Sequence, residues 1–282
     1  MLVNLKDVLT EAQKGKYAVG LFNTVTLEMA RGVIMAAEEA RSPVIIGTAE
    51  VLLPFAPLEE LSYLLVPMAK KASVPVVLNF DHGITPELII KSLSLGFTSV
   101  MYDCSTDSYE DNRFKCREMA KTVHMFGASI ETELGHVGAN EGGSAEGDDT
   151  SFMYTDPSQA REFANFTGTD ALAVAVGTAH GAYKSKPKLD FERLEAIAGL
   201  VSAPLVLHGG SGLSDDDFKT SIQKGISKVN IFTDVNVSSA HAAHELLSGS
   251  ESGMTDALPG IVEAVKNVTL RKIEIFGSCN KA

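Results

Sequence analysis

The sequence predicts an α/β fold, a (β/α)8 TIM barrel followed by a C-terminal helical extension. Eight short apolar segments rich in β-forming residues recur along the 282 residues, and segments with helical spacing lie between them. The repeat is therefore about 35 residues long, which is the length of one βα unit. We expect residues 1–282 to form a single barrel domain.

The eight predicted strands are mostly apolar on consecutive positions, as in parallel strands that are buried on both faces. In chain order they are 16–22, 43–47, 75–80, 98–102, 128–134, 171–176, 204–209 and 228–232. A doubly wound open sheet is the alternative. Its dinucleotide-binding form is disfavoured because no G-x-G-x-x-G turn follows the first strand.

Two apolar stripes with helical spacing predict helices that cover the sheet, one formed by Leu58, Leu61, Leu65 and Met68 and the other by Phe191, Leu194, Ala198 and Val201. Thr85-Pro86 and Asp156-Pro157 each place a side-chain acceptor before a proline, which is typical of a capped helix start. After the eighth strand, the segment 263–277 has a helical pattern. We expect this tail to pack on the barrel or on a neighbouring subunit.

Composition excludes several classes of partner. Lys and Arg number 24 against 36 Asp and Glu, so the net charge is −12. Binding to nucleic acid or to an anionic membrane surface needs clustered positive charge, and neither is expected. The three cysteines form no CxxC pair, and the sequence has no transmembrane-length apolar run and no signal-peptide pattern. We therefore expect a cytoplasmic protein.

Histidines recur where three predicted strands end. His82 follows the third strand, His180 the sixth and His208 lies at the end of the seventh. The carboxyl ends of barrel strands converge on one mouth, where active sites form. Three neutral imidazoles with an open position are the ligands of a catalytic zinc ion. The alternative for any one of them is a hydrogen-bonded rim residue.

Three carboxylates stand at the same rim. Asp81 precedes His82, and because side chains alternate along a strand we expect the two to diverge, one toward the metal and one toward the substrate. An aspartate near a metal can act as a general acid or base. Asp103 and Glu133, at the ends of the fourth and fifth strands, are candidates to orient a ligating imidazole or to bind metal themselves, unless they form a plain salt bridge or cap.

Two glycine-rich segments point to the substrate. Residues 208–212, His-Gly-Gly-Ser-Gly, lie where barrels bind phosphate and face the segment 230–233 of the eighth strand. The alternative is a plain turn before a helix. The polar, glycine-rich segment 138–152 is long enough for a mobile lid over the site, with a tolerated surface insertion as the alternative.

Five motifs resemble those of the class II, zinc-dependent ketose-bisphosphate aldolases. They are FDHG (80–83), IETELGHVG (130–138), VGTAHGAY (176–183), PLVLHGGSG (204–212) and KVNIFTD (228–234). Their order and spacing are most similar to the tagatose-bisphosphate and short fructose-bisphosphate aldolase branch. The resemblance extends from Phe22-Asn23 to the segment 276–281, which is nearly the whole chain.

The resemblance implies a role for each matching residue. His82, His180 and His208 match the zinc ligands, and Asp103 and Glu133 match positions of a second or alternative metal site. Asp81 matches the acid/base at the C4 hydroxyl, Glu141 a loop glutamate that moves a proton at the dihydroxyacetone phosphate carbon, and Asn230 an asparagine on the enediolate. The positions around the phosphate, where a monovalent cation (Na⁺ or K⁺) is often found, are Gly181, Gly209, Ser211 and Thr233.

The activity that the resemblance implies is reversible, metal-dependent aldol cleavage of a ketose phosphate to dihydroxyacetone phosphate and an aldehyde, through a zinc-stabilised enediolate. The substrate would resemble fructose or tagatose 1,6-bisphosphate, or a ketose 1-phosphate. Family members are commonly homodimers or homotetramers. A class I route is disfavoured because the sixth and seventh strands carry no lysine for a Schiff base. A zinc hydrolase or deaminase on the same barrel, and a non-catalytic sugar-phosphate binding protein, are the alternative functions.

One departure from the family pattern concerns the far end of the substrate. Many sugar-bisphosphate members have a basic residue where this chain has Asn236, and a small or acidic residue where it has Phe232. Lys184 and Lys186 are near enough in sequence to the sixth strand to compensate. Our hypothesis is that the enzyme keeps dihydroxyacetone phosphate as donor and prefers an acceptor without a terminal phosphate.

Overall fold

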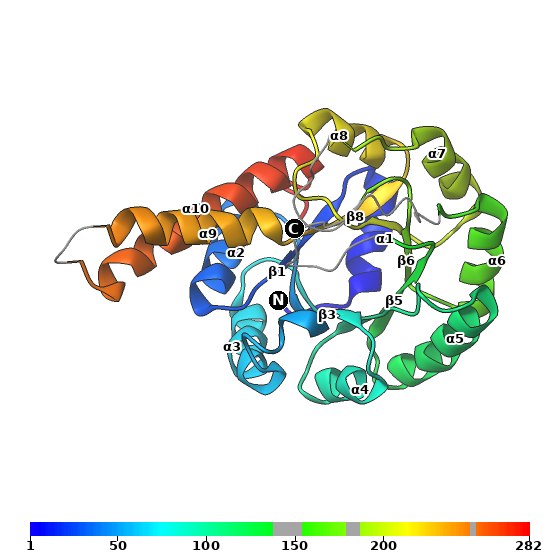
Figure 1. The fold of residues 1–282 in the computed structure, drawn as a ribbon, viewed down its shortest axis with the longest axis horizontal. Helices are drawn as coiled ribbons and strands as arrows, with labels where there is room; N and C mark the ends of the chain where they lie inside the picture. The colour runs from blue at the N-terminus through cyan, green and yellow to red at the C-terminus, as the bar shows by residue number, and fades with distance from the viewer. Residues whose placement is uncertain (138–153, 179–186, 249–251) are drawn as a thin grey trace.

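Eight parallel strands close into a barrel in the order in which they occur along the chain (Figure 1). The computed structural model describes residues 1–137, 154–178, 187–248 and 252–282. The strands are β1 Val19–Asn23, β2 Val44–Ala49, β3 Val76–Gly83, β4 Ser99–Tyr102, β5 Ser129–Leu134, β6 Ala171–Val174, β7 Leu205–Leu207 and β8 Ile226–Ile231. Each overlaps one predicted strand, so the predicted barrel is confirmed.

Helix α1 precedes the first strand, and the other helices follow strands and lie around the outside of the barrel (Figure 1). They are α1 Leu5–Gly15, α2 Leu27–Ala40, η1 Glu50–Leu52, α3 Leu58–Lys71, α4 Pro86–Ser94, α5 Tyr109–Met125, α6 Pro157–Thr167, α7 Phe191–Leu200, α8 Asp215–Gln223, α9 Thr233–Leu246 and α10 Met254–Phe276. Both predicted apolar stripes lie on helices, one on α3 and the other on α7, where Val201 is the residue after the last turn. Among the described residues, no helix combines the length and the apolar composition needed to cross a membrane.

The barrel interior is apolar at one end and polar at the other. The inward-facing Leu21, Ile45 and Val206 pack with Leu5 and Leu9 of α1, which closes the amino-terminal end of the barrel. Toward the carboxyl ends of the strands the inward positions become polar, with Asn23, Asp81, Glu131, Lys228 and Asn230 all buried. Because buried polar groups need partners, this layer must form a connected network, and it is here that the site lies.

The two predicted helix caps have different outcomes. Asp156 accepts hydrogen bonds from the backbone N–H groups of Ser158 (2.9 Å) and Gln159 (2.9 Å), so the cap of α6 is confirmed. Thr85 does occupy the position before α4, but its side chain makes no cap bond. Its hydroxyl donates instead to Glu50 (2.6 Å), which also accepts its backbone N–H (3.0 Å). The hydroxyl is thus a donor to a carboxylate, which is a strong acceptor, and does not accept an N–H group of the first turn of α4.

The C-terminal extension is a pair of helices that lie side by side and project from the barrel (Figure 1). α10 begins at Met254, nine residues before the predicted pattern, and packs on α9, α2 and β1. Near its end, Lys272 forms an ion pair with Asp234 (2.7 Å) at the start of α9. The expectation that the tail packs on the barrel is therefore confirmed.

Candidate metal centre and active site

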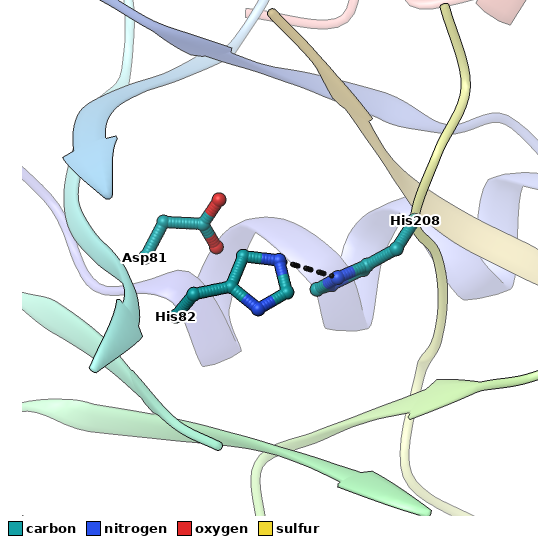
Figure 2. Close-up of side chains that lie close together, drawn as sticks. All are labelled: Asp81, His82 and His208. Atoms are coloured by element: carbon teal, nitrogen blue, oxygen red, sulfur yellow. Dashed lines mark hydrogen bonds between the residues drawn. The ribbon is translucent and has the colours of Figure 1, made fainter. Parts of the chain in front are cut away.

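Polar side chains from five strands meet at the carboxyl end of the barrel. Asp81 and His82 come from β3, and His208 follows β7 directly. In Figure 2 the two imidazoles lie edge to face, with the carboxylate of Asp81 beside them. Ligand atoms of these three residues all lie within 4.8 Å of one another. The structure thus brings together two of the three predicted zinc ligands and the predicted acid/base.

The backbone of β3 is irregular at the point where Asp81 and His82 lie. Its register with β4 shifts between Phe80 and Gly83, and His82 has a φ of 44°, in the left-handed region. A bulge of this kind changes the direction of one side chain. The prediction that Asp81 and His82 diverge is therefore wrong, because the irregular backbone breaks the alternation and both side chains reach the same cluster.

Carboxylates fix the protonation of both imidazoles. His82 Nδ1 lies 2.8 Å from Asp103 Oδ2, and His208 Nε2 lies 2.8 Å from Glu131 Oε1. A carboxylate only accepts, so these two nitrogens carry the protons. The other two, His82 Nε2 and His208 Nδ1, face each other at 3.0 Å (Figure 2). Two imidazole lone pairs turned toward one point fit a metal cation, and carboxylate–histidine pairs are typical partners of zinc ligands.

The pKa values of these groups agree with a metal-binding state. Burial, and then the neighbouring charges of His82 and Lys228, hold the pKa of His208 well below its usual value, so its imidazole is neutral. Burial opposes ionisation of Asp103, but the interactions with His82 and the hydrogen bonds from Ser105 together outweigh it and lower the pKa of that carboxyl. A neutral imidazole backed by an ionised carboxylate is the form that coordinates zinc.

Asp81 is fully buried and is held by amide donors. The side-chain N–H groups of Asn23 (2.9 Å), Asn79 (3.4 Å) and Asn230 (3.1 Å) donate to its carboxylate. Burial on its own raises the pKa of Asp81, but the electrostatic interactions with His82, Lys228 and His208 together outweigh burial, and the pKa lies below its ordinary value. An ionised carboxylate beside the facing imidazoles has the geometry of a general base.

Glu133 is the other buried carboxylate at the rim. Its Oε2 lies 3.5 Å from His208 Nδ1, and its Oε1 accepts a hydrogen bond from the backbone N–H of Val137 (3.2 Å). Burial and the negative charge of Asp103 raise its pKa to about 8. With His82 and Asp103 it forms a second group whose ligand atoms lie within 4.8 Å, so the two carboxylates predicted to assist or bind metal do lie beside His82.

The predicted phosphate loop follows β7. Gly209 and Gly212 have φ values of 64° and 89°, which glycine adopts without strain. The hydroxyl of Ser211 accepts the backbone N–H of Asp234 (3.4 Å), so the loop is tied to the start of α9, where Thr233 is the first residue. A loop rich in backbone N–H groups beside a helix N-terminus is an arrangement that binds anions.

The two residues predicted to set specificity lie at the β8 side of the mouth. Phe232 is buried and forms an apolar cluster with Ala49 and Leu52, against which Val25 packs. Asn236 is exposed on α9, one helical turn after Phe232, whose carbonyl accepts its N–H (2.9 Å). A buried apolar cluster therefore joins the end of β8 to the end of β2.

Some predicted residues lie outside the described residues. They are the third zinc ligand His180, the loop glutamate Glu141, the phosphate residue Gly181, the lysines Lys184 and Lys186, and the predicted lid 138–152.

Four polar residues inside the barrel were not predicted from the sequence. Asn23 and Asn79 hold Asp81, and Glu131 and Lys228 are an ion pair below His208. A signal for the pair was present. Glu131 is two residues before Glu133 and Lys228 two before Asn230, so strand alternation places all four on the inner face.

Comparison with known proteins decides the family. The family model described as "Fructose-bisphosphate aldolase class-II" matches residues 3–281. The chain belongs to the class II fructose-bisphosphate aldolase family. It is therefore an aldolase, a carbon–carbon lyase, of a family that generally depends on zinc.

Relatives of the aldolase cover its whole length. The chain is 41% identical to "Uncharacterized protein YdjI" of Escherichia coli K12 over 100% of both chains, and 37% identical to "Fructose-bisphosphate aldolase" of Thermus caldophilus, again over 100% of both. The crystal structure titled "YdjI aldolase" from Escherichia coli K12 superposes with a TM-score of 0.90 at 39% identity over 100% of each chain. The resemblance found in the motifs is confirmed.

Proposed function

We propose that the aldolase cleaves a ketose phosphate reversibly into dihydroxyacetone phosphate and an aldehyde that has no terminal phosphate. The observation that carries the aldol part is the ionised, amide-held carboxylate of Asp81 beside the facing imidazoles of His82 and His208. A base next to a metal position is what proton removal from the C4 hydroxyl requires. The family match supports the same reaction class.

Each residue of the site has its own proposed role in the reaction. His82, His180 and His208 would hold zinc, which when bound supplies Lewis-acid polarisation of the substrate carbonyl. Asp81 takes the proton from the C4 hydroxyl as the C3–C4 bond breaks and returns it in the reverse direction. Asn230 turns its amide N–H toward the same point, where a fixed donor stabilises developing negative charge. Glu141 moves the proton at the dihydroxyacetone phosphate carbon.

Binding of the donor phosphate is assigned to the loop after β7 and the start of α9. Gly181, Gly209, Ser211 and Thr233 would surround it, with Na⁺ or K⁺ nearby. The link between Ser211 and the backbone of Asp234 supports this assignment, because it brings the loop to the N-terminus of a helix of 14 residues. Lys272 pairs with the carboxylate of Asp234 and so offsets a negative charge beside the proposed phosphate position.

The preference for an unphosphorylated acceptor end rests on Phe232 and Asn236. The apolar cluster that Phe232 forms with Ala49 and Leu52 offers no hydrogen-bond donor side chain to a second phosphate. Asn236 supplies a neutral amide on α9. Charge-assisted contacts to a phosphate contribute about 1.5–3 kcal/mol each, so their loss shifts preference toward ketose 1-phosphates.

The test is release of dihydroxyacetone phosphate from a panel of ketose 1-phosphates and ketose 1,6-bisphosphates, coupled to glycerol-3-phosphate dehydrogenase. We expect ketose 1-phosphates to have the higher kcat/KM by about tenfold or more. A kcat/KM above about 10⁴ M⁻¹s⁻¹ on fructose or tagatose 1,6-bisphosphate would overturn the acceptor assignment and leave the aldol reaction standing. No release from any member would overturn the reaction itself.

Three further expectations belong with this proposal. Residues 1–282 act as one barrel aldolase domain, which the family match over 3–281 supports. The enzyme works as a homodimer or homotetramer, which light scattering on purified protein would test. A cytoplasmic location is supported by three free cysteines, which suit a reducing compartment.

A further inference from the structure

An ion pair lies entirely inside the barrel, below the candidate metal centre. Lys228 Nζ of β8 lies 2.7 Å from Glu131 Oε2 of β5, and both side chains are 0% exposed. Removing two charges from water costs several kcal/mol for each, and a buried ion pair often stabilises a fold no better than apolar residues of the same volume. Stability of the fold alone therefore does not account for this buried ion pair.

Both members of the pair use their remaining polar atoms on residues of the site. Lys228 Nζ donates to Asn230 Oδ1 (2.7 Å), and Glu131 Oε1 lies 2.8 Å from His208 Nε2. The pair thus connects the residue proposed to bind metal with the residue proposed to donate to the reacting oxygen.

The two charged partners determine the direction of each hydrogen bond that Lys228 and Glu131 make, and the contact of Asn230 Nδ2 with His208 Nε2 (3.4 Å) is then one between two donors. A lysine ammonium only donates and a carboxylate only accepts. Glu131 therefore requires the proton of His208 to be on Nε2, which leaves Nδ1 as the lone pair that faces His82. Lys228 requires Asn230 to turn its side-chain oxygen toward the ammonium group, so the side-chain N–H₂ of Asn230 faces Asp81 (3.1 Å).

We propose that Lys228 and Glu131 are positioning residues that set the tautomer of His208 for metal binding and the orientation of the Asn230 amide. This inference rests on the proposed function, because it takes His208 as a metal ligand. It has a specific consequence: exchanging Glu131 alone for glutamine reverses the hydrogen bond to His208, and exchanging Lys228 as well restores it.

The substitution Glu131→Gln tests whether the hydrogen bond to His208 reverses when the carboxylate is lost. Lys228 still donates, so it takes the oxygen of the new amide, and the amide N–H₂ must then face His208 Nε2. That nitrogen can only accept from it, so the proton moves to Nδ1 and blocks the metal-binding lone pair. We expect the affinity for zinc to fall about 10- to 100-fold, as is typical when the partner of a metal-binding histidine is changed.

The double variant Lys228→Met/Glu131→Gln tests whether the original direction of the hydrogen bond to His208 is restored. Methionine has a similar length and donates nothing, so the amide is released to turn its oxygen toward His208 Nε2 and its N–H₂ toward Asn230 Oδ1. We expect zinc affinity to return close to the wild-type value. A second substitution that restores what the first removed is not expected of a pair that only supports the fold.

The measurement is zinc affinity of the full chain, by competition with a chromophoric chelator, together with ¹⁵N spectra of histidine in the metal-free protein. The spectra should give a protonated Nε2 for His208 in wild type and the double variant, and a protonated Nδ1 in Glu131→Gln. Ser227→Ala is the matched control, because it changes a buried polar side chain of β8 on the outer face.

Two results would overturn the proposal: wild-type affinity in Glu131→Gln, or a double variant that binds zinc no better than Glu131→Gln. If Glu131→Gln does not fold, the double variant alone must still match wild type in affinity and tautomer. Failure of wild type to release dihydroxyacetone phosphate would instead count against the proposed function, because the zinc and tautomer measurements need no substrate.

Discussion

Replacing Asp81 with asparagine separates the two proton transfers of the proposed reaction. The side chain is fully buried and accepts hydrogen bonds from three amides, so the substitution keeps the volume, removes the base and turns one of the two accepting atoms into a donor. General-base catalysis is worth about 10²–10⁴-fold. We therefore expect kcat for cleavage to fall by that factor, which corresponds to about 3–5 kcal/mol in the activation barrier.

Two other properties should survive Asp81→Asn. Zinc content should be unchanged, because the two described imidazoles keep their carboxylate partners Asp103 and Glu131. Exchange of solvent deuterium into dihydroxyacetone phosphate should also persist, because the proposal assigns that proton to Glu141.

Coupled dihydroxyacetone phosphate release, metal analysis and NMR of the exchange reaction measure the three quantities. Asp107→Asn is the matched control, because Asp107 is a carboxylate that pairs with Lys115 (2.8 Å). Our reasoning is refuted if Asp81→Asn cleaves substrate at nearly the wild-type rate, or if it loses deuterium exchange together with cleavage.

Three more predictions concern specificity and stability. Asn236→Arg should raise kcat/KM for ketose 1,6-bisphosphates about tenfold relative to 1-phosphates, because a guanidinium would add a charge-assisted contact to the distal phosphate; an unchanged ratio in the coupled assay would contradict it. In the metal-free protein, Glu133 has a pKa of about 8 against an ordinary 4.5, so the folded state holds the proton that the unfolded state releases. The free energy of unfolding should then fall as pH rises between those two values, by about 1 kcal/mol per pH unit, and Glu133→Gln should remove this slope in urea titrations at a series of pH values. Thr26→Ala removes the side-chain acceptor of the Met29 N–H (3.2 Å) at the start of α2. The free energy of unfolding, measured by urea titration, should fall by about 1 kcal/mol, and a loss near zero would contradict this prediction.

The barrel could be predicted because its strands are buried on both faces. That burial requires continuous apolar runs such as 75–80 and 171–176, and the parallel order then follows from the helices between them. Because barrel strands end at one mouth, the positions of Asp81 and His208 at two strand ends already predicted that they meet. The apolar pattern predicted the barrel, and the positions at the strand ends predicted that Asp81 and His208 lie together.

The remaining features depend on distances that periodicity does not contain. The bulge at His82 arises from a register shift between two strands, and its left-handed backbone has no signature in the letters FDHG. The carboxylate of Glu50 reaches Thr85 from a different βα unit and binds the hydroxyl that was predicted to cap α4. The Lys228–Glu131 pair joins strands that are not neighbours in the barrel. Each is a tertiary contact between segments whose separate sequences look ordinary.

A zinc titration of the stripped enzyme tests most directly whether a metal centre at His82 and His208 supports aldol cleavage. The enzyme is treated with EDTA, dialysed and assayed for dihydroxyacetone phosphate release from a ketose 1-phosphate as zinc is added back. We predict that activity is lost on stripping and returns in proportion to zinc, reaching its plateau at about one equivalent per chain. Full activity in the stripped enzyme, or stoichiometric zinc binding without any return of cleavage, would contradict it.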